Sequence, residues 1–421
     1  MSISKLRIEN FKGIRNLGEF DIRPITLFIG PNSSGKSSCI HALAALAQTS
    51  KLPSSGRPLV LDDEYAQVHL GRFIEVIHTK KYTDPIGIGF ESQSIRSSIS
   101  GFEKEKKLSF GDTFAADFSF RSTKRTQDIY LANLAYRTPG TQLTFQLDGN
   151  AKYLVEYDGV KIPAISTYES SLNVSIAPKA DDPNQLKPIF DAFLYNETCK
   201  RIVASELANV LYLGPFRQSP IRRYPTRGSS PTEVGAQGEN AITLLANEYV
   251  QTKGRPHLKQ ISGWLHEMGL AKNVEVARVG KSDLFDVKVT LSDGIALPIA
   301  DLGYGMSQVL PVLAQCSFAP ERSTLLFEQP ELHLNHSAAQ LMAAVLVEAA
   351  VKKSLHIIAE THSRELFHGL LDQLRQKKLS VNDLAIYTVE RKDGCSQFMK
   401  INVEVDKNGH VDVYDPWDKN L

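Results

Sequence analysis

The chain has few cysteines, and none of them are close together in the sequence. Its four cysteines are Cys39, Cys199, Cys316 and Cys395, and no Cys-x-x-Cys pair occurs. Paired or clustered cysteines are the usual signature of structural zinc sites and disulfide frameworks, so we expect neither. Isolated thiols fit the reducing interior of a cell, and we therefore expect a cytoplasmic protein.

Long apolar runs and an excess of one charge are also lacking. No segment approaches the ~18–20 apolar residues that a membrane-spanning helix needs. The first residues mix charged and apolar side chains, unlike a signal peptide, so we expect no membrane partner. Lys plus Arg number 48 against 47 for Asp plus Glu. Nucleic acid stays open as a partner only through a local basic patch.

The segment from residue 25 to residue 48 combines a short apolar strand, a Gly-rich turn and a helix rich in Ala and Leu. The turn, residues 30–37, fits G-x-x-x-x-G-K-[ST] at every required position. Its backbone N–H groups can close around an anion, and the helix start favours negative charge. Lys36 is expected to reach the β- and γ-phosphates of ATP, and Ser37 to bind Mg²⁺. The expected nucleotide-binding residues are Gly30, Pro31, Asn32, Ser33, Ser34, Gly35, Lys36, Ser37 and Ser38.

A second apolar strand, residues 323–328, ends in the carboxylate of Glu328. In a P-loop protein this is the place of the Walker B acid, which holds Mg²⁺. A buried strand that ends in an exposed Glu is the alternative, but the P-loop in the same chain favours the metal role. A Gly-x-Gly-x-Ser motif at 303–307 precedes this strand, and Glu-Thr-His-Ser at 360–363 follows it. Alone, the first motif could be a turn and helix cap, and the histidine of the second could be structural, but their order and spacing make a shared site the better interpretation.

This order of motifs resembles the ABC-type ATPases, and in particular the ATPase heads of the SMC, RecF and OLD families. In those proteins the signature loop of one subunit closes over the γ-phosphate held by the other. The resemblance implies that Ser307 and the backbone near Gly305 contact nucleotide in trans, and that His362 corresponds to the switch histidine. It also implies a homodimer or a higher homo-oligomer.

A closer resemblance is to the stand-alone AAA-family, ABC-like ATPases of bacterial anti-phage defence operons. The segments that carry it are 6–13, 212–217, 238–241, 328–334 and 360–363, whereas 51–205 contribute little. This resemblance implies an ATPase that acts as a nucleotide-gated sensor or regulator of a separate effector protein, a nuclease or a toxin. Two alternatives stay open: a RecF-like DNA-repair ATPase that binds DNA, and an ATP-binding scaffold with negligible turnover.

The residue after Glu328 departs from the ABC pattern. ABC ATPases usually place a catalytic Glu there, whereas this chain has Gln329. An amide cannot accept a proton as a carboxylate does, although it can orient water, so we expect slow hydrolysis. Glu331 is a substitute base or, alternatively, a solvated residue at a helix start. The expected catalytic residues are therefore Glu328, Gln329, Glu331 and His362.

The order of the expected elements indicates an α/β fold whose nucleotide-binding core is split by an insertion. We expect a P-loop NTPase with an ABC-ATPase-like head and a β-rich and helical insertion between the two halves of the core. The predicted divisions are 1–50 for the N-terminal half with the P-loop, 51–210 for the β-rich insertion, 211–283 for a loop and helical subdomain, 284–400 for the C-terminal half, and 401–421 for the tail.

Basic residues gather in a Pro-rich loop that contains Arg217, Arg222, Arg223 and Arg227. The loop either contacts phosphate, from ATP across a dimer or from nucleic acid, or is simply solvated. A second basic run, Lys104, Lys106 and Lys107, is expected at an exposed hairpin tip. Gln48 is expected on the surface, and Gln67 is a candidate Q-loop glutamine. The C-terminal tail, with Asp412, Asp415 and Asp418, is too short to supply a nuclease domain.

Overall fold

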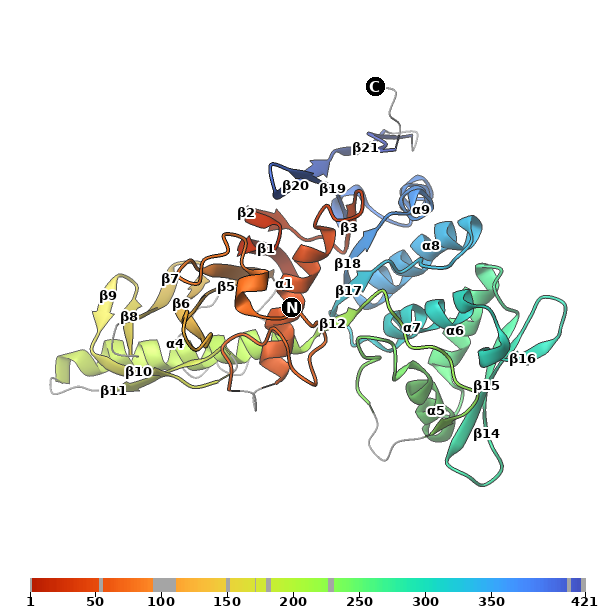
Figure 1. Ribbon diagram of the computed structural model, residues 1–421, viewed down its shortest axis with the longest axis horizontal. Coiled ribbons are helices and arrows are strands. Elements are labelled where there is room, and N and C mark those ends of the chain that lie inside the picture. Colours follow the sequence, from red (N-terminus) through yellow and green to blue (C-terminus); the bar gives the residue numbers. More distant parts are fainter. Residues whose placement is uncertain are drawn as a thin grey trace. The chain divides into compact units, whose positions relative to one another are not determined.

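The computed structural model describes residues 2–52, 56–93, 111–148, 152–170, 172–178, 183–225, 231–406 and 410–417 (Figure 1). The chain forms two compact units. The first unit comprises Met1–Ile22, Ser33–Val210 and Glu390–Phe398, and the second comprises Arg23–Asn32, Leu211–Val389 and Met399–Leu421. The Lys104, Lys106 and Lys107 run, Arg227 and Asp418 lie outside the described residues. The division into domains made from the sequence stays a prediction.

An eight-stranded antiparallel sheet forms the centre of the first unit, in the order β2-β1-β4-β5-β6-β7-β8-β9. Phe114, Tyr136 and Phe145 lie on neighbouring strands, and their ring centroids are 5.9 and 6.4 Å apart. Such aromatic pairs stabilise adjacent strands. The strands are β1 (Ser2–Phe11), β2 (Ile14–Asp21), β4 (Ile86–Gln93), β5 (Thr113–Ser122), β6 (Ile129–Thr138), β7 (Thr141–Leu147), β8 (Tyr153–Tyr157) and β9 (Val160–Ile162), with a separate hairpin of β10 (Ala164–Tyr168) and β11 (Val174–Pro178).

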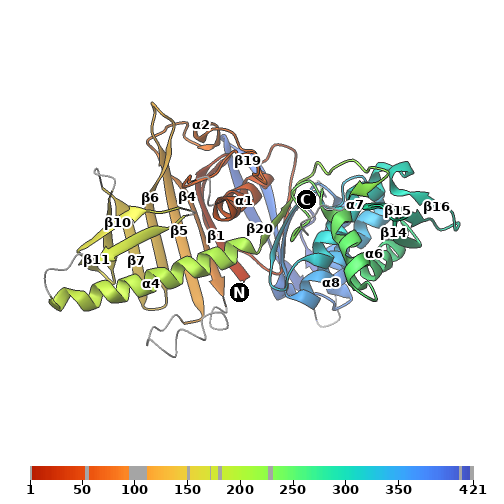
Figure 2. The same cartoon turned by 90° about the horizontal axis from the view of Figure 1, so that it is seen from below.

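Helices cover this sheet. They are α1 (Lys36–Lys51), the short α2 (Phe73–Val76) and the long α4 (Pro183–Ala208). Figure 2 shows α4 running along one side of the sheet, and α4 contacts β7, β9 and α1. Its buried residues Ile189, Ala192, Tyr195, Cys199 and Ile202 recur at the three- and four-residue spacing of one helix face.

The core sheet of the second unit confirms the predicted split α/β core. Its order is β12-β17-β18-β3-β19-β20, and β17, β18, β3 and β19 pair in parallel. The N-terminal strand β3 thus lies between two strands from the C-terminal part of the chain. The strands are β12 (Val210–Leu213), β17 (Thr324–Glu328), β18 (His356–Thr361), β3 (Ile25–Ile29), β19 (Leu384–Lys392) and β20 (Cys395–Ile401).

The second unit also contains five named α-helices and smaller sheets. The helices are α5 (Ala241–Gln251), α6 (Pro256–Glu267), α7 (Tyr304–Phe318), α8 (His336–Lys353) and α9 (Arg364–Arg375). The remaining strands are β13 (Tyr224–Pro225), β14 (Asn273–Arg278), β15 (Leu284–Thr290), β16 (Ala296–Pro298), β21 (Val403–Val405) and β22 (Val411–Val413). No helix among the described residues is long and apolar enough to cross a membrane.

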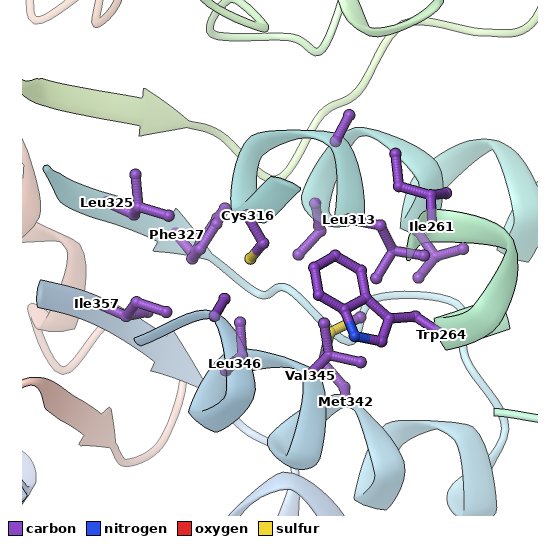
Figure 3. Packing of buried hydrophobic residues seen from close by; sticks show 14 of the residues in the cluster. Ile261, Trp264, Leu313, Cys316, Leu325, Phe327, Met342, Val345, Leu346 and Ile357 are labelled. Carbon is purple, nitrogen blue, oxygen red and sulfur yellow. The ribbon is translucent and has the colours of Figure 1, made fainter. Parts of the chain in front are cut away.

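Apolar side chains from α6, α7, α8 and the core sheet form the centre of the second unit (Figure 3). Trp264 of α6, Leu313 of α7 and Val345 of α8 are at most 2% exposed. The indole Nε1 of Trp264 donates a hydrogen bond to Glu348 Oε2 at 2.9 Å, which satisfies the one polar atom of this side chain. The helices that flank the core sheet are thereby fixed by close packing.

The prediction of a surface position for Gln48 is wrong. Its side chain is 1% exposed. Its Nε2 donates to the carbonyl oxygens of Val60 and Val68 at 2.7 and 3.2 Å, and its Oε1 accepts from the Val68 N–H at 2.9 Å. The buried Gln48 amide thus provides hydrogen-bond partners for backbone groups of Val60 and Val68, which lie in the loop after α1 and not in a strand.

Candidate functional site

The carboxyl ends of three neighbouring parallel strands in the second unit carry Glu328, the segment 360–362 and the start of the P-loop, residues 30–32. The register pairs Glu328 of β17 with Glu360 of β18, and Thr361 of β18 with Ile29 of β3. The P-loop begins directly after β3, and His362 directly follows β18. Ligands of open α/β sheets bind at this edge, outside the carboxyl ends of the strands. The candidate site is therefore this edge of the core sheet.

The P-loop continues from β3 into α1, whose first residue is Lys36. Ser33 and Gly35 have φ values of 61° and 100°, which glycine adopts more easily than other residues. A Cβ at Gly35 would also overlap the hydroxyl of Ser396, so this position requires glycine on two counts. The Ser34 hydroxyl is buried and has no hydrogen-bond partner among the described residues. It is therefore available to an anionic oxygen.

The other predicted P-loop residues differ in exposure. Lys36 is 4% exposed and Ser38 is 5% exposed. The Ser38 N–H donates to the Gly35 carbonyl at 3.0 Å, which closes the first turn of the helix. Pro31, Asn32 and Ser33 are exposed, and Gly30, Gly35 and Ser37 are half-buried.

Glu328, the predicted Walker B acid, is 6% exposed at the end of β17. The hydroxyl of Tyr212 donates to its Oε1 at 2.6 Å. Burial, and then the negative charge of Glu328, raise the pKa of Tyr212 well above its usual value. Tyr212 therefore stays protonated and donates its hydrogen bond to the carboxylate of Glu328.

Gln329 has a left-handed backbone with φ of 48°. Its N–H donates to the Glu360 carbonyl at 3.0 Å. On the other side, Nη2 of Arg217 donates to the carbonyl oxygens of both Glu328 and Gln329, each at 3.0 Å. The strained peptide is thus held by three hydrogen bonds to groups outside it.

Arg217 is buried, at 6% exposure, so the solvated-loop alternative is wrong for this arginine. Burial lowers its pKa to about 10, while the carboxylates of Glu331 and Glu328 act in the opposite direction, so it stays charged at neutral pH. Arg222 and Arg223 of the same loop are exposed and pair with Asp301 and Asp286. The loop therefore contains one buried cation and two solvated ones among its described residues.

Glu331 is buried in the turn before α8, at 9% exposure. The alternative of a solvated helix-start residue is therefore wrong. The hydroxyl of Thr361 donates to its Oε1, and its Oε2 has no hydrogen-bond partner among the described residues. Burial raises the pKa of Glu331, and the Thr361 bond and the charge of Arg217 oppose this rise. A carboxylate with a raised pKa and an unpartnered oxygen is suited to accept a proton.

A cavity of about 530 Å³ lies at this edge within the second unit. Its lining combines two amides, two carboxylates and imidazole rings, which can orient water and transfer protons. Residues that line it include Asn32, Gln329, Glu331, His333, His362 and Glu365.

The signature residues lie in the first turns of α7. A Cβ at Gly305 would lie 2.9 Å from the His333 carbonyl oxygen, so glycine lets α7 approach the turn after β17 closely. Ser307 is 5% exposed, and its hydroxyl donates to the Tyr304 carbonyl at 2.9 Å. The Tyr304 side chain is 67% exposed. The solvent-accessible part of this motif is therefore the first turn of the helix with Tyr304.

Sequence reasoning missed Tyr212 as a site residue. It named Arg217 but missed the burial of this side chain against the end of β17. Tyr212 lies 116 residues before Glu328, and Arg217 lies 111 residues before it. The apolar pattern of β12 indicates only a buried strand. A buried hydroxyl and guanidinium need hydrogen-bond partners, but nothing local says which distant groups supply them.

Two family models match the chain. Residues 1–184 match one described as "AAA ATPase domain". Residues 217–367 match one described as "AAA domain, putative AbiEii toxin, Type IV TA system". The first match contains the P-loop, and the second contains the signature motif, Glu328 and His362. No curated protein sequence matches the chain.

Solved structures of SMC head domains are similar to the chain at low sequence identity. An SMC head bound to the C-winged helix domain of ScpA is 12% identical with a TM-score of 0.49, and the match covers 96% of this chain and 98% of that one. An Smc head domain with an extended coiled coil bound to the C-terminal domain of ScpA, derived from Pyrococcus furiosus, is 11% identical with a TM-score of 0.47. That match covers 95% of this chain and 96% of the other. The SMC head domain from Thermotoga maritima is 11% identical with a TM-score of 0.40, and the match covers 96% of this chain and 100% of that one.

Proposed function

We propose that the chain, two parts of which match AAA ATPase domain models, is a slow, nucleotide-gated P-loop ATPase switch that regulates a separate effector protein. The observation that carries this proposal is the edge of the core sheet. There the P-loop begins after β3, and Glu328 and His362 lie at the ends of the two adjacent parallel strands. A phosphate loop beside a Walker B acid supports ATP binding and hydrolysis, and the amide of Gln329 supports slow turnover.

In this proposal the backbone of residues 30–38 holds the phosphates of ATP, and Lys36 balances their charge. The buried, unpartnered hydroxyl of Ser34 fits an oxyanion at this loop. Ser37 and Glu328 would hold Mg²⁺, which would neutralise the negative charge that develops on the phosphates. No cluster of three His, Cys, Asp or Glu side chains able to hold a metal exists in the described part of the chain. Mg²⁺ does not need one, because phosphates and waters supply most of its ligands.

Hydrolysis in this proposal divides its tasks between an amide and a carboxylate. The Gln329 amide orients the attacking water, and Oε2 of Glu331 accepts the proton that the water loses. The half-buried His362 contacts the γ-phosphate. The 530 Å³ cavity that these three residues line supports their joint action.

We further propose a head-to-tail homodimer or higher homo-oligomer around ATP. The first turn of α7, with Gly305 and Ser307, closes over the nucleotide of the partner subunit. Support comes from the exposed Tyr304 and from the N–H groups of that turn, which favour an anion. Because Ser307 Oγ bonds within its own helix, its contact with nucleotide would need a rotation of the side chain on closure.

The proposed setting is bacterial anti-phage defence, with a nuclease or toxin as the separate effector. This part rests on the resemblance of the sequence motifs to ATPases of defence operons and not on the geometry of the site. One of the two matching family models has a toxin–antitoxin description, which is stated of that family.

The experiment is a phosphate-release assay with Mg²⁺ on the purified chain, together with a nuclease assay on DNA and RNA. We expect measurable ATP hydrolysis slower than the ~1 s⁻¹ lower end of common enzyme turnover numbers. We expect no nucleic-acid cleavage by this polypeptide alone. Metal-dependent cleavage that is lost on mutating Asp412 or Asp415 to Asn would overturn the separate-effector proposal.

A further inference from the structure

Arg217 lies in the second unit with its guanidinium against the end of β17. It is 6% exposed, and buried arginines are rare unless their charge and donors are used. Its Nη2 donates to the carbonyl oxygens of Glu328 and Gln329, each at 3.0 Å. The carboxylates of Glu328 and Glu331 are close enough to stabilise its charge. Nη2 of this cation is therefore committed to the peptide that follows the Walker B acid, while its buried Nε and Nη1 have no hydrogen-bond partner among the described residues.

That peptide needs external support, because Gln329 is a non-glycine residue at φ of 48°. Such residues persist in the left-handed region only when the surrounding structure holds them there. Here the N–H of Gln329 donates to the Glu360 carbonyl of β18, and Arg217 holds the two carbonyls on the other side. The backbone of Gln329 is thereby fixed from both sides, with its side chain lining the cavity beside Glu331.

The main chain of Arg217 reaches the signature helix. Its carbonyl oxygen accepts a hydrogen bond from Gln308 Nε2 at 3.5 Å. Gln308 follows Ser307 directly and is 5% exposed. One residue therefore contacts both α7 and the end of β17.

We infer that Arg217 is a positioning residue, which holds the Gln329 amide in its working orientation and links it to the signature helix α7. The inference rests on the proposed ATPase function. Arg217 acts on the rate of the chemical step through Gln329 and makes no contact with ATP. This distinguishes it from a phosphate-binding arginine, whose loss would weaken ATP affinity.

The test compares Arg217→Met with Arg217→Lys and with Arg223→Met, a matched control at an exposed arginine of the same loop. ATP affinity is measured with a fluorescent ATP analogue, and kcat by phosphate release. We expect Arg217→Met to lower kcat about 10- to 100-fold, as loss of an outer positioning partner typically does. Its ATP affinity should stay within about threefold of wild type. Arg217→Lys should retain more activity, because an ammonium can still donate to both carbonyls, and Arg223→Met should match wild type.

A double-mutant cycle measures the coupling between Arg217 and Gln329 in kcat, which a general loss of stability would not produce. Gln329→Ala should lower kcat in the wild-type background and lower it much less in the Arg217→Met background, because the Gln329 side chain is no longer held in its working orientation there. Should Arg217→Met fail to fold, the same cycle is run with Arg217→Lys.

Four outcomes are informative. A wild-type kcat in the Arg217 variant, or a parallel loss of affinity and rate, overturns the positioning role. An equal loss of kcat from Gln329→Ala in the wild-type and Arg217→Met backgrounds does the same. If the wild-type chain itself neither binds nor hydrolyses ATP, the proposed function fails, and the inference that rests on it fails as well.

Discussion

Replacing Glu331 by Gln tests the assignment of the proton acceptor. The change keeps the shape of a side chain that is only 9% exposed, and Gln can still accept the hydrogen bond from Thr361. It removes the negative charge and the buried carboxylate oxygen Oε2, which has no hydrogen-bond partner among the described residues. Folding and ATP binding should survive, whereas proton transfer should not.

The expected loss in kcat is ~10²–10⁴-fold, the range that a positioned general base contributes. The stability effect has the opposite sign. Burial raises the pKa of Glu331 in the folded state, so the folded protein holds this proton more tightly than the unfolded chain. Its contribution to stability is full below the unfolded pKa and is lost as the pH rises through the folded pKa. Glu331→Gln should therefore gain stability relative to wild type as the pH rises through that window.

The assay pairs phosphate release under saturating ATP with urea unfolding at several pH values. Glu365→Gln is the matched control, because Glu365 lines the same cavity but its carboxylate is bonded to Ser363 and His336. That control should keep most of the activity. If Glu331→Gln hydrolyses ATP at the wild-type rate, Glu331 is not the base. If Glu331→Gln loses ATPase activity only to the extent that it unfolds, the carboxylate is structural.

Three further perturbations address the partner subunit, the missing catalytic Glu and the core. Ser307→Arg should bind ATP but fail to hydrolyse it, and mixing it with Lys36→Ala should restore activity through one intact composite site; no recovery in demonstrated mixed dimers argues against a shared site. Gln329→Glu should leave kcat nearly unchanged, because Glu331 already accepts the proton, and a rise of ~10²–10⁴-fold in phosphate release would contradict the assignment of Glu331 as the base. Leu313→Ala, at a fully buried position, should lower the free energy of unfolding by about 2–5 kcal/mol, and a loss well under 1 kcal/mol in urea titration would show that the site repacks.

The elements that carry the motifs could be predicted because their signals are local. The strand and helix around Lys36 follow from a five-residue apolar run and a glycine-rich turn, and β3 and α1 confirm them. The apolar runs before Glu328 and His362 likewise predict β17 and β18. Parallel strands with consecutive motifs at their carboxyl ends meet at one edge, so the gathering of these motifs was also predictable.

The supports of the site could not be predicted, because they depend on residues far apart in the chain. Arg217 was grouped with exposed arginines since sequence alone shows four basic residues in one loop. Its burial depends on backbone carbonyls that lie 111 residues away. Gln48 shows the same limit, because its amide is buried by a loop with no periodic pattern. The burial of Glu331 depends on the conformation of the turn before α8, and the sequence does not show this conformation.

The central claim is that the P-loop binds ATP, and the most direct measurement is the affinity of labelled ATP for wild type and Lys36→Ala. Lys51→Ala, at the other end of α1, is the matched control, and unfolding midpoints verify that each variant folds. The account predicts that Lys36→Ala loses most of the ATP affinity while Lys51→Ala keeps it, because only Lys36 lies in the phosphate loop. Equal ATP affinity of wild type and folded Lys36→Ala would contradict the claim.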